Sequence, residues 1–225
     1  PYPYTEDGKV RWEEGTDWPD PINLFSYLAG ATKKINFYTS VYILPARNPL
    51  RAAKEISTLA NFSNGRFSLG IGMGWMPEEF KVGEQAFRMR GKRADEMIEV
   101  MKKLWSGDMH SFNGEFYNYE PLEMLPKPNH KIPILVGGFS KPAIRRAAQH
   151  DGWVSDLHSL EELKTLIKKI KQQRKEKNKT EEYKIIAFSC WDAFSADGFK
   201  KMQEIGVTTI TTYPWMLYGV MNEAP

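Results

Sequence analysis

The chain has 225 residues, of which 41% are hydrophobic and 26% charged, and this composition is typical of a globular protein with a packed core. The net charge of +3 and the lack of a long apolar run lead us to expect neither a nucleic-acid partner nor a membrane. The single cysteine, Cys190, excludes an internal disulfide and predicts a reducing, cytoplasmic compartment. The four histidines have no partner at a metal-ligand spacing, so we expect no metal site.

Helices and strands are predicted to alternate along the chain. Asp20 before Pro21 and Asn48 before Pro49 are typical of helix starts, whereas residues 35–44 are rich in the β-branched and aromatic residues of a buried strand. In chain order we predict helix 21–32, strand 35–44, helix 48–62, strand 66–71, helix 91–105, strand 132–136, helix 140–149, strand 153–154, helix 160–177, strand 184–190, helix 195–205 and strand 207–212.

Two stretches interrupt this alternation. Residues 75–90 are predicted to be an exposed connection that carries the adjacent carboxylates Glu78 and Glu79. Residues 107–131 are predicted to be an irregular excursion over the surface. It contains a β-hairpin over 110–117, because polar and apolar residues alternate around Asn113-Gly114. No stretch has the composition of a linker between domains, so we expect one domain over residues 1–225.

Six strands separated by helices predict a parallel sheet covered by helices. Two architectures fit this order, a doubly wound open sheet and a closed eight-stranded barrel of about 250 residues. The first 20 residues have the composition of a polar loop, as expected after a strand that would precede Pro1.

Ligands bind at the carboxyl ends of strands in parallel α/β folds, so the strand ends hold the candidate site residues. Gly137-Gly138-Phe139-Ser140 follows a strand and begins a helix, and it is either a phosphate site or a simple glycine turn with a serine cap. Gly70, Gly72 and Gly74 do not have the dinucleotide-binding spacing. They permit either the approach of a flat ring or close strand packing.

Charged clusters are interpreted as solvated surface. Glu78 and Glu79 are candidates for acid–base chemistry, but adjacent carboxylates on an exposed turn favour a surface role. The basic stretch 164–179 has helical spacing and no interleaved aromatic residues, which favours a solvated helix face over a nucleic-acid patch.

Several motifs together resemble the luciferase-like monooxygenase family. They are LPARNPLRAAKEISTLANFSNGRFSLGIGMGWMPEEF from Leu44 to Phe80, RGKRADEMIEVMKKLW from Arg90 to Trp105, FNGEFYNYEPLEMLPKP, and PILVGGFSKPAIRRAAQHDGW ending at Trp153. GIGMGWMPEEF together with YILP is closer to the branch that uses the deazaflavin coenzyme F420 than to the branch that uses flavin mononucleotide (FMN).

The resemblance implies a (β/α)8 TIM barrel whose N-terminal strand or strands are absent from this chain and which has an insertion after the fourth strand. It also implies a non-prolyl cis peptide at Ser40-Val41 that supports the cofactor ring. Gly72, Gly74 and Trp75 would line the ring or its side chain. Gly137, Gly138, Phe139 and Ser140 would hold the cofactor phosphate. No catalytic residue is assigned, because the resemblance places such residues in part before Pro1.

The activity that the resemblance implies is an F420-dependent hydride transfer to or from a small organic substrate. One alternative is an FMN-dependent monooxygenase that uses oxygen and a separate flavin reductase. Another is a non-catalytic flavin-binding protein. A homodimer is expected from the resemblance. An unrelated barrel hydrolase is disfavoured, because glycines and aromatic residues, rather than carboxylates or metal ligands, occupy the strand ends.

Overall fold

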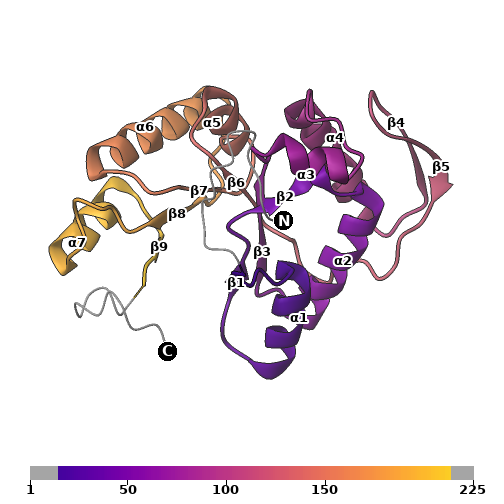
Figure 1. The fold of residues 1–225 in the computed structure, drawn as a ribbon, viewed down its shortest axis with the longest axis horizontal. Coiled ribbons are helices and arrows are strands. Elements are labelled where there is room, and N and C mark those ends of the chain that lie inside the picture. The colour runs from indigo at the N-terminus through magenta and orange to yellow at the C-terminus, as the bar shows by residue number, and fades with distance from the viewer. Residues whose placement is uncertain (1–14, 214–225) are drawn as a thin grey trace. The chain divides into compact units, whose positions relative to one another are not determined.

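The computed structural model describes residues 15–213, which form two compact units that divide between Ile132 and Pro133 (Figure 1). Most of the predicted N-terminal loop, residues 1–14, lies outside the described residues, as do residues 214–225. Strands and helices alternate strictly in the second unit, the first unit mixes helices and strands less regularly, and the paired core strands of both units are parallel. The described part therefore has the expected α/β fold, while closure into an eight-stranded barrel and the extent of the insertion stay predictions.

The first unit is built around β3, whose six residues are all buried. Strands β1 and β2 both pair with β3 in parallel, with Phe37 opposite Phe67 and Tyr42 opposite Ile71. The elements of this unit are α1 (Pro21–Ala31), β1 (Phe37–Tyr38), β2 (Tyr42–Ile43), the 3-10 helix η1 (Leu44–Ala46), α2 (Pro49–Phe62), β3 (Phe67–Gly72), α3 (Pro77–Val82), α4 (Arg90–Leu104), β4 (His110–Asn113) and β5 (Asn118–Leu122).

The residues that predicted helix starts form the expected N-terminal caps. The Asp20 carboxylate accepts the amide N–H groups of Ile22 and Asn23 at 3.0 and 3.2 Å, and the following proline occupies the first turn of α1. Asn48 caps α2 in the same way. These caps satisfy amides that have no partner inside the helix, so both helices begin where the sequence predicts.

The predicted continuous strand over residues 35–44 is wrong, because β1 and β2 are separated by residues 39–41. The Thr39 hydroxyl donates a hydrogen bond to the carbonyl of Gly70 at 2.7 Å and accepts one from the Gly70 amide at 2.9 Å. A side chain thus takes the place of the main-chain partner at this point of the ladder. The peptide bond that follows, Ser40-Val41, is cis, as the family resemblance implies.

Helix α3 is a second departure from the sequence prediction, which placed an exposed connection there. Met76, the N-cap residue that precedes the helix, makes no side-chain cap, so the usual polar signal is missing. Glu78 and Glu79 lie half-buried in its first turn, where the positive end of the helix dipole stabilises carboxylates. Phe80 is fully buried and anchors the helix.

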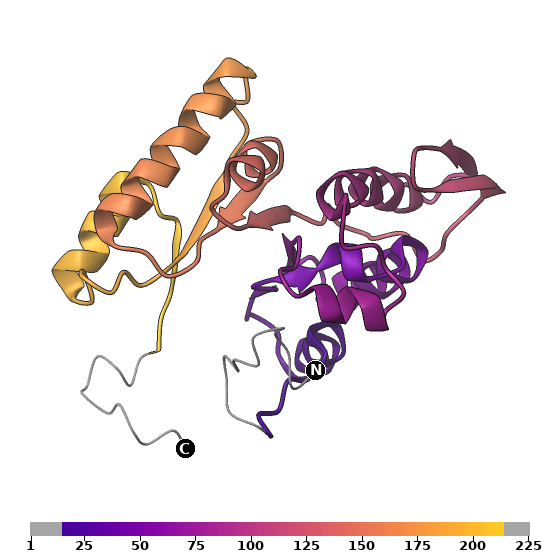
Figure 2. The same cartoon turned by 45° about the horizontal axis from the view of Figure 1, so that its top comes forward.

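The second unit is a four-stranded parallel sheet in the order β6-β7-β8-β9, with helices between successive strands (Figures 1 and 2). Its elements are β6 (Ile134–Gly137), α5 (Lys141–Ala147), β7 (Gly152–Val154), α6 (Leu160–Glu176), β8 (Lys184–Phe188), α7 (Ala196–Ile205) and β9 (Thr209–Thr211). Ser159 and Glu162 form a complete capping box at the start of α6. No helix within residues 15–213 is long and apolar enough to cross a membrane.

The predicted hairpin is present as β4 and β5, and one carboxylate fastens its turn to α4. Glu96 accepts the amide N–H groups of Glu115, Phe116 and Tyr117 at 2.9, 2.9 and 2.7 Å. Gly114 lies so close to this carboxylate that an added Cβ would meet its oxygen at 2.2 Å. The turn is therefore held through its main chain.

Replacing Glu96 with Gln should loosen this hairpin, because the amide NH2 group would face backbone N–H donors. Charge-assisted hydrogen bonds contribute about 1.5–3 kcal/mol each, so we expect a loss of at least about 2 kcal/mol of unfolding free energy in urea. Amide hydrogen exchange should accelerate over residues 110–122. Glu99→Gln on the exposed side of α4 is the matched control. Equal effects of the two substitutions would contradict this role of Glu96.

Candidate functional site

The predicted site residues fall into two groups, one in each unit, and each group is described within its own unit. The first contains Ser40, Val41, Gly72, Gly74 and Trp75. The second contains Gly137, Gly138, Phe139 and Ser140.

The turn from β6 to α5 has the geometry that its glycines predict. Gly137 ends the strand, and Gly138 has a φ of +99°, a left-handed conformation that side chains disfavour. An added Cβ on Gly138 would lie 3.3 Å from the Cβ of Ala143, so space is also tight. The Ser140 hydroxyl then accepts the amide N–H of Ala143 at 3.4 Å and caps α5.

A tryptophan from the neighbouring strand fixes this turn. Trp153 is fully buried on β7, opposite Val136 of β6, and its indole Nε1 donates to the carbonyl of Gly138 at 2.8 Å. The hydrogen bond satisfies the indole group and holds the main chain of the turn in one orientation. The sequence carries no local signal of this contact, because the two residues are 15 positions apart.

Phe139 and His158 complete an aromatic stack at the carboxyl ends of β6 and β7. The His158 ring lies nearly parallel to Trp153, with centroids 6.5 Å apart, and meets Phe139 edge to face at 5.5 Å. Phe139 nevertheless keeps 57% of its surface exposed. The stack therefore presents an aromatic face to a ligand beside a polar turn. The place of His158 in this stack was not predicted from the sequence, where the histidines were considered only as metal ligands.

In the first unit, the structure brings Ser40 and Val41 against β3. An added Cβ on Gly72 would meet Cγ2 of Val41 at 2.4 Å, and one on Gly70 would meet the Thr39 carbonyl oxygen at 1.8 Å. Close packing of residues 39–41 on β3 thus explains both glycines.

Gly74 and Trp75 lie just beyond the carboxyl end of β3. Gly74 has a φ of +74°, and its carbonyl accepts a hydrogen bond from Nε of Arg90 at 3.0 Å. An added Cβ would meet the side chains of Phe80 and Ile43 at 2.7 and 2.9 Å. Trp75 is 44% exposed, so it offers an aromatic surface to a ligand.

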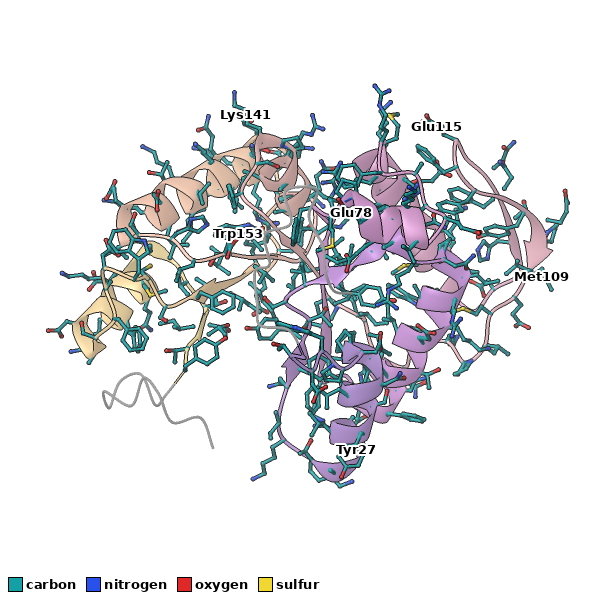
Figure 3. All side chains as sticks on the ribbon, in the orientation of Figure 1. Tyr27, Glu78, Met109, Glu115, Lys141 and Trp153 are labelled. Carbon is teal, nitrogen blue, oxygen red and sulfur yellow. The ribbon has the colours of Figure 1, made fainter. Side chains whose placement is uncertain are left out.

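Charged and nucleophilic groups offer little chemistry of their own. Burial, reinforced by the charge of Asp192, raises the pKa of the Cys190 thiol to about 11, so the thiolate that would act as a nucleophile is scarce near neutral pH. Glu78, which is labelled in Figure 3, and Glu79 are both half-buried in the first turn of α3. Carboxylates that divide acid and base roles need unlike surroundings. Within residues 15–213, no cluster of His, Cys, Asp and Glu could hold a metal ion.

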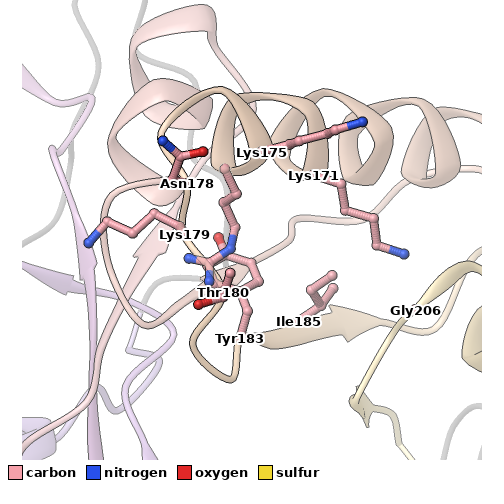
Figure 4. Close-up of a pocket in the computed structure, with 9 residues that line it drawn as sticks. Lys171, Lys175, Asn178, Lys179, Thr180, Tyr183, Ile185 and Gly206 are labelled. Atoms are coloured by element: carbon pink, nitrogen blue, oxygen red, sulfur yellow. The ribbon is translucent and has the colours of Figure 1, made fainter.

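A basic pocket lies at the amino-terminal end of β8, away from the strand ends where ligands usually bind (Figure 4). Two of its cations serve the fold. Lys171 donates to the carbonyl of Ile205 at 3.0 Å, and Arg174 donates to the carbonyl of Glu181 at 2.8 Å while its guanidinium covers the Tyr183 ring. These contacts connect α6 to the segments around it.

Comparison with known proteins identifies relatives that match most of the chain. Residues 6–191 match the model of the luciferase-like monooxygenase family. The chain is also 38% identical, over 209 residues, to the uncharacterised protein Rv0940c of Mycobacterium tuberculosis, a match that covers 93% of this chain and 72% of that protein.

Two solved structures show the same fold. An F420-dependent secondary alcohol dehydrogenase, in complex with an F420–acetone adduct, aligns with a TM-score of 0.77 at 16% identity. That alignment covers 89% of this chain and 80% of the dehydrogenase chain. The oxygenating constituent of 3,6-diketocamphane monooxygenase from Pseudomonas putida, in complex with FMN, aligns with a TM-score of 0.64 at 26% identity. That alignment covers 76% of this chain and 53% of the monooxygenase.

Close packing at Gly72 can be tested by a double-mutant cycle. Gly72→Ala should lower the unfolding free energy by about 1–3 kcal/mol, because the new methyl group overpacks against Val41. Val41→Ala removes the clashing Cγ2, so the double variant should recover at least about 1 kcal/mol relative to additivity in urea unfolding. Gly70→Ala should not be rescued by Val41→Ala, because it clashes with a backbone oxygen. Strict additivity for Gly72 and Val41 would show that the contact is absent.

Proposed function

This chain belongs to the luciferase-like monooxygenase family, and from that membership we propose that it is an oxidoreductase that uses coenzyme F420 to move a hydride to or from a small organic substrate. Proteins with a similar fold include an F420-dependent enzyme and an FMN-containing monooxygenase. A flavin-type cofactor is therefore the common element of both possible activities.

The observation that carries the proposal is the β6–α5 turn. Gly138 turns the main chain at a positive φ, and the Trp153 indole holds its carbonyl, so the turn is set before any ligand arrives. Backbone and hydroxyl groups beside the exposed Phe139 ring match a cofactor that has both a phosphate and an extended apolar part. These residues fit a flavin-type cofactor.

We assign Gly137, Gly138, Phe139 and Ser140 to the phosphate side of the cofactor, and Ser40, Val41, Gly72, Gly74 and Trp75 to its ring system. When bound, a deazaflavin supplies a carbon centre that accepts or donates a hydride. The role of the chain is to bind and orient the cofactor and to exclude water. The raised pKa of the Cys190 thiol leaves little thiolate for a competing nucleophilic chemistry.

The choice of F420 over FMN rests on the GIGMGWMPEEF segment and on the extent of structural likeness. The F420-dependent dehydrogenase aligns with a larger share of both chains than the FMN-containing monooxygenase does. The higher sequence identity of the monooxygenase, 26% against 16%, favours FMN as the second candidate. In that case the protein would use oxygen and a separate flavin reductase. A homodimer in the cytoplasm is proposed for either activity.

Direct titration tests the proposal. F420 and FMN are added separately to the protein, and the fluorescence of each cofactor and of the tryptophans is followed. We expect F420 to bind more tightly than FMN. Selective binding of FMN would favour the monooxygenase, and binding of neither would contradict both candidates.

The variant Gly138→Ala should weaken binding of the cofactor about tenfold. Alanine disfavours a positive φ by about 1–2 kcal/mol, so the turn would leave its binding conformation. Gly30→Ala is the matched control, because an added Cβ there meets no atom within 4 Å and alanine stabilises a helix. Unchanged affinity in Gly138→Ala, with the fold intact by circular dichroism, would remove the turn from the binding site.

A further inference from the structure

A groove between α5 and α6 begins at Phe139, directly beside the turn assigned to the cofactor phosphate. Lys141, which is labelled in Figure 3, and Arg145 line it from α5, and Lys169 lines it from α6. Lys141 and Arg145 are four residues apart, so their side chains lie on the same face of the helix. The two helices contact each other along the groove.

The cations of this groove are not used by the fold. Lys141, Arg145 and Lys169 are exposed, and their side chains make no ion pair or hydrogen bond with any residue of the described chain. The acidic member of the lining, Glu176, is hydrogen-bonded to Gln172 at 3.0 Å, and the basic Lys177 follows it in the chain. The groove therefore has an uncompensated positive charge.

The charge changes sign on the other side of Phe139. A second pocket shares Phe139 and Lys169 with the groove but is lined by Asp156, Glu161 and Glu162. An anion that leaves the β6–α5 turn is thus attracted toward Lys141 and Arg145 and repelled from the second pocket. Phe139 marks the boundary between the two.

We propose that the groove between α5 and α6 binds an anionic, carboxylate-bearing tail that extends from the cofactor phosphate. This inference rests on the proposed function and names a basis for its cofactor selectivity. F420 carries a chain of glutamate residues beyond its phosphate, whereas FMN ends at the phosphate. The groove therefore increases the affinity for F420 and does not change the affinity for FMN.

The size of the effect follows from the exposure of the cations. An exposed ion pair changes an equilibrium by about 1.5- to 5-fold, so three together give about 3- to 100-fold. Such contacts are screened over about 8 Å at physiological ionic strength. The contribution of the groove should therefore decrease steeply as salt is added.

The test compares two triple variants of the whole chain. One carries Lys141→Gln, Arg145→Gln and Lys169→Gln, and the control carries Lys168→Gln, Lys175→Gln and Lys179→Gln, which remove the same charge outside the groove. Dissociation constants are measured by fluorescence for F420, for F420 stripped of its glutamates, and for FMN, at low and high salt. Thermal unfolding checks that both variants fold.

We expect the groove variant to lose about 3- to 100-fold affinity for F420 at low salt and to bind the stripped cofactor and FMN as the wild type does. Unchanged F420 affinity in the groove variant, with F420 still bound by the wild type, overturns the groove while leaving the proposed function standing. An equal loss of F420 affinity in the control variant also overturns the groove proposal, because it indicates that the cofactor is attracted by the overall positive charge of the protein. Failure of the wild type to bind F420 at all overturns both the groove and the proposed function.

Discussion

The packing of residues 39–41 against β3 is the constraint on which the first unit depends. The Thr39 side chain takes both hydrogen bonds of Gly70, and Val41 occupies the space where a side chain at Gly72 would lie. β1 and β2 can pair with the same strand only because β3 presents glycines at these points. In the second unit the main chain is held by a different contact, because the buried Trp153 indole donates a hydrogen bond to the carbonyl of Gly138. In both units a side chain holds the backbone of the neighbouring segment at the candidate site.

Much of the fold is readable from local sequence because its signals are local. Asp20 and Asn48 cap the helices that they predict, and the hairpin forms around Asn113-Gly114. Helix α3 escaped prediction because Met76 provides no polar cap. The break between β1 and β2 escaped it because the Thr39 hydroxyl competes with main-chain pairing across 31 residues of sequence.

The candidate site is predictable to a smaller degree. The glycine turn at residues 137–140 follows from composition alone, since few residues other than glycine adopt the φ of Gly138. Its partners Trp153 and His158 are brought there by the pairing of β6 with β7, a long-range contact that no local pattern encodes. Gly70 and Gly72 were interpreted from the sequence as permitting either ligand approach or close packing. The structure shows that residues 39–41 pack closely against both.

The anchoring of the hairpin by Glu96 has a consequence for protein engineering. The carboxylate binds the main-chain amides of residues 115–117, so the exposed side chain of Glu115 can be exchanged while this anchor stays, provided that Gly114 is retained. The hairpin tip is thus a modular position. A fluorophore-bearing or surface-immobilising residue placed there keeps the main-chain hydrogen bonds to Glu96.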